Sequence, residues 1–129
     1  MKLMNLPTWE AMELGDRLKI YYEKNKPLFG PLGSALHKVR FAQGRLEQRI
    51  ALLRHIEAIR LYAAEHKGQL PEKLSEIAVP LPVDPFTGKP FRYSVEGATA
   101  HLRGTSPKGL EGIAVYNIHY ELTIATRNP

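Results

Sequence analysis

Five histidines are the side chains best suited to do chemistry in this sequence, and their spacing limits what that chemistry can be. They are His37, His55, His66, His101 and His119. His55 and His66 stand eleven residues apart on one expected helix, which separates them by about 16 Å, too far to share a metal ion. His101 and His119 fall on different expected strands and could be cross-strand neighbours, but no carboxylate pair obviously joins them. We therefore expect ordinary surface or half-buried histidines, no metal site and no cofactor.

Other reactive groups lack the sequence context that catalysis needs. Ser94, Thr105 and Ser106 are not part of a nucleophile-elbow pattern. The stretch 30–33 contains two glycines but lacks the Lys-Ser/Thr ending of a phosphate-binding loop. The chain has no cysteine, which excludes disulfides, thiolate chemistry and cysteine-based zinc sites. We expect a protein that is not an enzyme and has no small-molecule substrate.

Composition and charge indicate one small globular domain with a basic surface. The 129 residues are 43% apolar and 24% charged, and no apolar run approaches the ~18 residues of a membrane span. The net charge is +5. On a helix, Arg45, Arg49 and Arg60 fall on one broad face. This face is either a solvated helix surface, which we favour, or a stripe that follows phosphates, which makes nucleic-acid or polyanion binding the alternative function.

The apolar pattern predicts two helices before residue 70. The first covers 7–24 and forms, with a Pro/Gly-rich break that ends at residue 33, a helical arm over 1–33. This arm either folds back on the second helix or extends from it. The second helix covers 34–67 and is about 50 Å long, so one end must project from a small domain or pack on another chain. Its recurring apolar residues are Leu36, Val39, Ala42, Leu46, Ile50, Leu53 and Ile56.

After the long helix the pattern changes to short strands. A short helix is expected over 71–77, and a β-meander over 91–125. The first hairpin pairs 91–95 with 98–103 across a two-residue loop, Glu96-Gly97, and residues 113–125 supply one further strand or two. The predicted fold class is α+β, with a domain over 34–129 in which the C-terminal end of the long helix lies on a small antiparallel sheet.

A turn at residues 84–90 has residue types that fix its conformation. Asp84 can accept backbone N–H hydrogen bonds, Pro85 restricts φ, Gly88 permits a left-handed conformation, and Pro90 ends the loop. We expect a structural turn here. The aromatic residues around it, Phe86, Phe91 and Tyr93, are expected to be core anchors.

Two segments resemble the head domains of type IV pilins and type II secretion pseudopilins. The first is Arg60-Leu-Tyr-Ala-Ala-Glu-His-Lys-Gly-Gln-Leu-Pro-Glu-Lys-Leu-Ser-Glu-Ile77, which looks like the end of a pilin spine helix and its continuation. The second is Val83-Asp-Pro-Phe-Thr-Gly-Lys-Pro-Phe-Arg-Tyr93, which is similar to the "DP.tGkPy.Y" segment of pseudopilins. The resemblance covers residues 46–124. It implies a spine helix packed on a sheet and a non-enzymatic subunit of a bacterial envelope or secretion complex.

The chain departs from that family in two respects. Family members begin with an apolar helix that anchors them in the inner membrane, whereas the segment before Arg60 carries several charges. The chain is then either the soluble part of a longer, envelope-located protein or a reuse of the fold elsewhere, including the cytoplasm. Major pseudopilins bind calcium in an acidic C-terminal loop, but the stretch 105–112 offers only Glu111, so we expect no calcium site.

The expected role is association with protein partners or with copies of the chain through the long helix. Leu36, Val39 and Phe41 are apolar on the part of that helix farthest from the predicted sheet, and Trp9 is a further candidate. Alternatively, Trp9 covers these residues within the same chain, together with Tyr21 and Tyr22.

Overall fold

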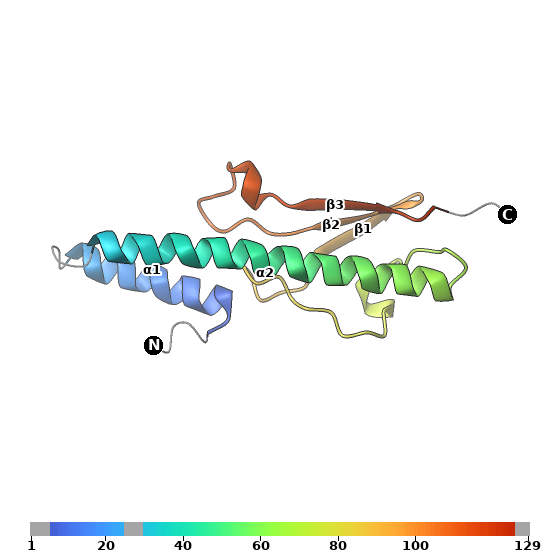
Figure 1. The fold of residues 1–129 in the computed structure, drawn as a ribbon, viewed down its shortest axis with the longest axis horizontal. Helices are drawn as coiled ribbons and strands as arrows, with labels where there is room; N and C mark the ends of the chain where they lie inside the picture. Colours follow the sequence, from blue (N-terminus) through green and yellow to red (C-terminus); the bar gives the residue numbers. More distant parts are fainter. Residues whose placement is uncertain (1–5, 25–29, 126–129) are drawn as a thin grey trace.

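The computed structural model describes residues 6–24 and 30–125, with side chains described for 6–17 and 35–125. The fold is α+β, as predicted (Figure 1). Its helices and strands are α1 (Thr8–Lys24), α2 (Gly30–Glu65), β1 (Arg92–Glu96), β2 (Thr99–Arg103) and β3 (His119–Thr123), with short 3₁₀ helices at Leu74–Glu76 and Ala114–Tyr116.

The two helices form an antiparallel hairpin, so the N-terminal arm folds back (Figure 1). Thr8 donates a hydrogen bond from Oγ1 to Glu47 at 2.5 Å, and Arg40 donates to the backbone oxygen of Leu6 at 2.6 Å. Helix α2 already begins at Gly30, so residues 30–33 are helical and the prediction that they belong to a break is wrong. Pro31 fits there because the first turn of a helix has no intrahelical use for its N–H. The rest of the predicted break, 25–29, lies outside the described residues.

Helix α2 ends with a left-handed reversal. Lys67 has φ 57° and Gly68 has φ 84°, and the Gly68 N–H donates to the Ala63 oxygen at 2.7 Å. This bond spans five residues and closes the helix with the geometry of a Schellman motif. The reversal sends the chain back along α2 (Figure 1), and Leu74 and Ile77 pack on the core. The expected short helix over 71–77 is reduced to the 3₁₀ turn Leu74–Glu76.

The row of α2 residues that is buried against the domain is not the apolar row predicted from the sequence. Gly44, Gln48, Leu52, His55 and Ile59 are buried at three- and four-residue spacing. In contrast, most large apolar residues of the predicted row are exposed: Leu36, Val39, Leu46, Ile50 and Leu53. The apolar pattern does not predict this buried row, because glycine, glutamine and histidine are not apolar residues.

The three strands form an antiparallel meander in the order β1-β2-β3. Glu96 pairs with Thr99, so the hairpin loop is Gly97-Ala98, one residue later than predicted. Gly97 has φ 61° at the first loop position, where a primed turn requires a positive φ. The last segment supplies a single strand, β3, preceded by the 3₁₀ turn Ala114–Tyr116.

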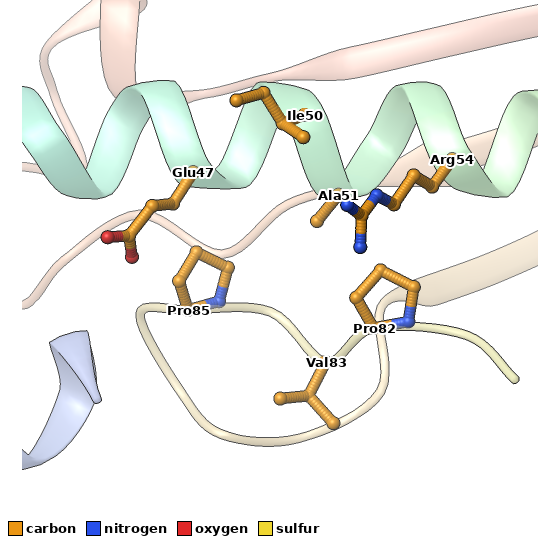
Figure 2. Close-up of a pocket in the computed structure, with 7 residues that line it drawn as sticks. All are labelled: Glu47, Ile50, Ala51, Arg54, Pro82, Val83 and Pro85. Carbon is orange, nitrogen blue, oxygen red and sulfur yellow. The ribbon is translucent and has the colours of Figure 1, made fainter. Parts of the chain in front are cut away.

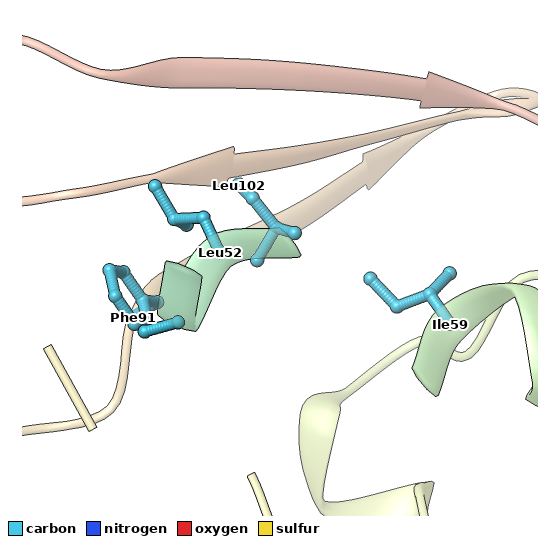
Figure 3. Packing of buried hydrophobic residues seen from close by; sticks show 5 residues of the cluster. Leu52, Ile59, Phe91 and Leu102 are labelled. Carbon is cyan, nitrogen blue, oxygen red and sulfur yellow. The ribbon is translucent and has the colours of Figure 1, made fainter. Parts of the chain in front are cut away.

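The core lies between the C-terminal half of α2 and one face of the sheet (Figure 3). Leu52 and Ile59 of α2 meet Phe91 and Leu102, and alternate residues of β3 cover the edge of this cluster. Tyr93 closes one side by donating its hydroxyl to the Pro71 oxygen at 2.6 Å. Burial raises the pKa of Tyr93 to about 12, so the hydroxyl keeps the proton that it donates.

Two neighbouring leucines of α2 test this two-sided arrangement. Leu52 is fully buried and Leu53 is 52% exposed. Leu52→Ala leaves a cavity in the core and is expected to lower the free energy of unfolding by about 2–5 kcal/mol. The control, Leu53→Ala, is expected to stay within about 0.5 kcal/mol of the wild type. Urea denaturation followed by circular dichroism measures both, and equal losses at the two positions would contradict the orientation of α2.

His55 predicts a specific loss of stability in mild acid. Its ring is 1% exposed, contacts Phe91 edge-on and hydrogen bonds to the Ala51 oxygen at 2.7 Å. Burial lowers the pKa of His55 below its ordinary value near 6.5, so the unfolded chain takes up a proton at a higher pH than the folded chain does. This contribution to stability is present above about pH 6.5 and is lost as the pH falls toward the folded pKa.

The change to test is His55→Gln, which removes the titrating group. The free energy of unfolding of the wild type is expected to fall more between pH 7.5 and 5.5 than that of His55→Gln. His66→Gln is the matched control, because His66 is exposed. Parallel pH profiles for the wild type and His55→Gln would show that burial of His55 does not control this loss.

Candidate functional site

Asp84 lies at the centre of a closed turn that holds α2 against the sheet. Its side chain is 1% exposed. One carboxylate oxygen accepts the Phe86 N–H at 3.0 Å, and the other accepts the Thr105 N–H at 2.7 Å. Gln48 of α2 donates from Nε2 to the same carboxylate at 3.1 Å and to the Thr105 oxygen at 3.1 Å. The carboxylate therefore joins three segments that are far apart in the sequence.

The backbone of the turn has the geometry that its sequence predicts. The Asp84 oxygen accepts the N–H groups of Thr87 and Gly88, and the Asp84 N–H donates to Lys89. Gly88 has φ 67°, the left-handed conformation that glycine adopts without strain. Pro85 is buried, and Pro90 leads directly into the buried Phe91. Since its acceptors are occupied by donors from the chain, Asp84 acts as a structural joint.

Two glycines make this joint possible. A Cβ on Gly104 would lie 2.5 Å from Gln48 Nε2, and a Cβ on Gly44 would lie 2.7 Å from the Phe86 ring. Both distances are shorter than van der Waals contact allows, so only glycine lets the loop and the ring approach α2 this closely. Gly44, Gln48 and Gly104 were not predicted as part of the turn. A glycine in the middle of a long predicted helix was the signal that pointed to Gly44.

Two of the four predicted interaction residues are engaged inside the chain. Trp9 packs over Gly88, where a Cβ would lie 2.7 Å from the indole, and it is half-buried. Phe41 belongs to an aromatic group: its ring centroid lies 4.4 Å from that of His37 and 6.1 Å from that of Tyr116. Trp9 thus covers the turn at residue 88. The side chains of Tyr21 and Tyr22 lie outside the described residues.

The other two, Leu36 and Val39, belong to an exposed apolar surface that follows α2. We call this surface the α2 stripe; its members are between 46% and 60% exposed and are Leu36, Val39, Leu46, Ile50, Leu53 and Leu61. At 100° per residue they fall within a sector of about 100°, roughly opposite the buried row of Gln48 and Leu52. The stripe is about 38 Å long. Single exposed leucines are ordinary, whereas these six form an aligned row along the helix.

A shallow hollow beside the stripe extends it toward the segment that precedes Asp84 (Figure 2). Glu47, Ala51 and Arg54 of α2 face Pro82 and Pro85 across it, and its other lining residues are Ile50 and Val83. Its volume is about 220 Å³, below the ~300–1,000 Å³ typical of ligand pockets. The hollow is therefore smaller than a typical small-molecule site.

The predicted basic face is only partly free. Arg45 stacks on Tyr116, with its guanidinium carbon 5.3 Å from the ring centroid, and Arg60 forms an ion pair with Glu57 at 3.0 Å. Arg49 is exposed beside the stripe. Over residues 35–65, six basic side chains outnumber three acidic ones: Lys38, Arg40, Arg45, Arg49, Arg54 and Arg60 against Glu47, Glu57 and Glu65.

The structure brings two of the five histidines together. His101 and His119 are 3.0 Å apart at Nδ1 and Nε2. His55 is buried in the core, and His66 stacks on Tyr62 with ring centroids 3.8 Å apart. These two histidines were predicted as possible cross-strand neighbours that no carboxylate pair obviously joins; the register places Glu121 and Glu96 beside His101.

Comparisons of the chain with protein-family models, with curated proteins and with solved structures found no match. The resemblance to pilin and pseudopilin heads therefore rests on the two sequence segments alone. Among the described helices, none is long and apolar enough to cross a membrane.

Removing the negative charge of Asp84 is expected to lower the free energy of unfolding substantially. Asp84→Asn replaces one acceptor oxygen with an NH₂ group, which cannot accept the N–H of Phe86 or of Thr105, whichever of the two it faces. The buried N–H left unpaired is expected to lower the free energy of unfolding by about 1–3 kcal/mol. Asp16→Asn, at an exposed position of α1, is the control and is expected to be near neutral. Urea denaturation of both variants makes the comparison, and a near-neutral Asp84→Asn would show that the joint contributes little.

Proposed function

We propose that this protein is a non-enzymatic assembly module that docks through the α2 stripe onto an amphipathic helix of a partner protein. The observation that carries the proposal is the row of six large apolar side chains on the side of α2 opposite the domain core. A helix that buries one row in its own domain and exposes a second apolar row has a surface suited to a groove or to another helix.

Charge favours a partner with acidic residues over a second copy. Arg49 and Lys38 lie on one flank of the stripe and Arg54 on the other. Of the acidic residues nearby, Glu47 is bonded to Thr8 and Gln43, and Glu57, which falls within the sector of the stripe, is paired with Arg60. Two copies of α2 placed stripe to stripe would bring two helices with the same basic excess together, which costs free energy. A partner helix with glutamates or aspartates beside its apolar row would instead pair with these arginines.

The size of the stripe indicates a moderate affinity. Burying the exposed half of six leucine-like side chains yields roughly 6 kcal/mol, which is comparable to the cost of immobilising two proteins in a complex. The apolar row alone therefore gives weak binding, and the charged flanks supply both the added affinity and the selection of the partner.

The segments at 60–77 and 83–93 support a narrower version of the same role. A long helix beside a small meander, with a turn of the Asp-Pro-x-Thr-Gly type between them, is the order of elements expected of a pilin- or pseudopilin-like head. On this version the module belongs to a bacterial envelope or secretion-type complex.

Two synthetic helices test the docking surface. Both are 21-residue peptides with the same leucine row, flanked by glutamates in one and by lysines in the other. The glutamate peptide is expected to bind about tenfold or more tightly, as judged by fluorescence anisotropy. Leu46→Asp/Leu53→Asp is expected to abolish this binding, whereas Glu65→Asp, at the exposed end of α2, is the control and should leave it unchanged.

The same experiments test other binding partners for the α2 stripe. Equal binding of both peptides, or a stripe-dependent dimer in sedimentation equilibrium, would overturn the acidic-partner proposal. Tighter binding to duplex DNA than to the glutamate peptide, with a log–log salt slope near −0.9 per phosphate contacted, would favour the polyanion-binding alternative.

A further inference from the structure

The solvent face of the sheet carries a cluster of groups with no part in the core or in the α2 stripe. Strand alternation points Leu102 and Tyr120 into the core, so their neighbours His101, His119 and Glu121 lie on the opposite face. His101 and Glu121 are direct cross-strand partners in the β2–β3 register. His119 is two residues before Glu121 and therefore lies beside both.

Three ligand atoms in this cluster converge. His101 Nδ1 is 3.0 Å from His119 Nε2 and 3.7 Å from Glu121 Oε1, and His119 Nε2 is 4.0 Å from the same Oε1. A triangle with these sides has a circumscribed radius of about 2.1 Å, which is the length of a zinc–nitrogen or zinc–carboxylate bond. A single point in the plane of the three atoms thus lies at bonding distance from all of them, and small side-chain shifts that move the metal out of this plane would give it a tetrahedral geometry.

We propose that His101, His119 and Glu121 form a binding site for a divalent transition metal of the zinc class. Two imidazoles and one carboxylate are a ligand set that Zn²⁺ accepts, and they leave a fourth tetrahedral position. Metal binding replaces the direct His101–His119 hydrogen bond by two nitrogen–metal bonds. Each of these ring nitrogens then donates a lone pair to the metal, which requires neutral imidazoles.

Glu96 lies where its carboxylate can orient the His101 ring. The other ring nitrogen of His101, Nε2, lies 3.8 Å from Glu96 Oε2. A carboxylate on the far nitrogen favours the tautomer that has its proton there, which leaves Nδ1 free to bind a metal. Glu96 belongs to β1, so all three strands contribute to the site. The role of Glu96 is that of a positioning residue, because its carboxylate lies on the far side of the ring from the three ligand atoms.

The exposure of the ligands determines what the fourth position holds. The side chain of His101 is 13% exposed, whereas those of His119 and Glu121 are 35% and 63% exposed. The metal therefore lies at the surface, and water occupies the remaining position. Coordination would also tie β3, an edge strand of the sheet, to the central strand β2.

Zinc binding to the whole chain tests the proposal directly. Competition against a chromophoric zinc indicator is expected to show one Zn²⁺ per wild-type chain, and Co²⁺ is expected to give the strong visible bands of a tetrahedral nitrogen–oxygen site. His101→Gln and His119→Gln should each weaken binding by more than about 100-fold, while Glu96→Gln should weaken it by about 10–100-fold, the range typical of an outer partner.

The controls separate ligand loss from misfolding. His66→Gln removes an exposed histidine that is far in sequence from His101 and His119, and it should leave zinc binding unchanged. Melting of each metal-free variant should match that of the wild type, and Zn²⁺ should raise the melting temperature of the wild type but not of His101→Gln/His119→Gln. A wild type that binds no zinc at micromolar concentration, or a double variant that binds it as tightly, would overturn the proposal.

Discussion

The carboxylate of Asp84 is the constraint on which the arrangement of helix and sheet depends. It accepts donors from α2, from its own turn and from the segment after β2, and all of these lie in the interior, where an unpaired charge would be costly. To reach it, Gln48 leaves its own Oε1 without a hydrogen-bond partner in the described part of the chain. That a buried polar atom is left unsatisfied indicates how closely the loop at Gly104 and the helix must approach.

This joint also explains why α2 can expose an apolar row. The middle of the helix is held to the domain by a glycine, a glutamine and a histidine rather than by a continuous apolar face. On the inner side, Gln48 Nε2 donates to Asp84 and Thr105, and His55 hydrogen bonds to the Ala51 oxygen. The large aliphatic residues on the outer side, such as Leu46 and Leu53, are more than half exposed and lie outside the core.

The fold was largely predictable from the sequence, but the orientation of α2 was not. Helix lengths, the meander and the Asp84 turn follow from local signals: periodicity, glycine placement and turn chemistry. Which face of a helix is buried depends on tertiary contacts. In α2 the most apolar row is exposed, so the apolar pattern predicts the wrong buried face. The hairpin loop at Gly97 lies one residue later than predicted, because local sequence patterns do not define the ends of strands to within one residue.

The cluster at His101 shows the same limit at the level of chemistry. The two histidines and Glu121 are separated by up to twenty positions in the chain, and only the β2–β3 register makes His101 and Glu121 direct partners. Since side chains alternate between faces, a slip of one residue would turn one strand's ligands into the core and remove the site. The buried joint and the core fix the sheet relative to α2, and the pairing of the strands then sets which polar groups meet on its outer face. The metal site proposed there is therefore a consequence of register, as the exposed stripe is a consequence of how α2 is held.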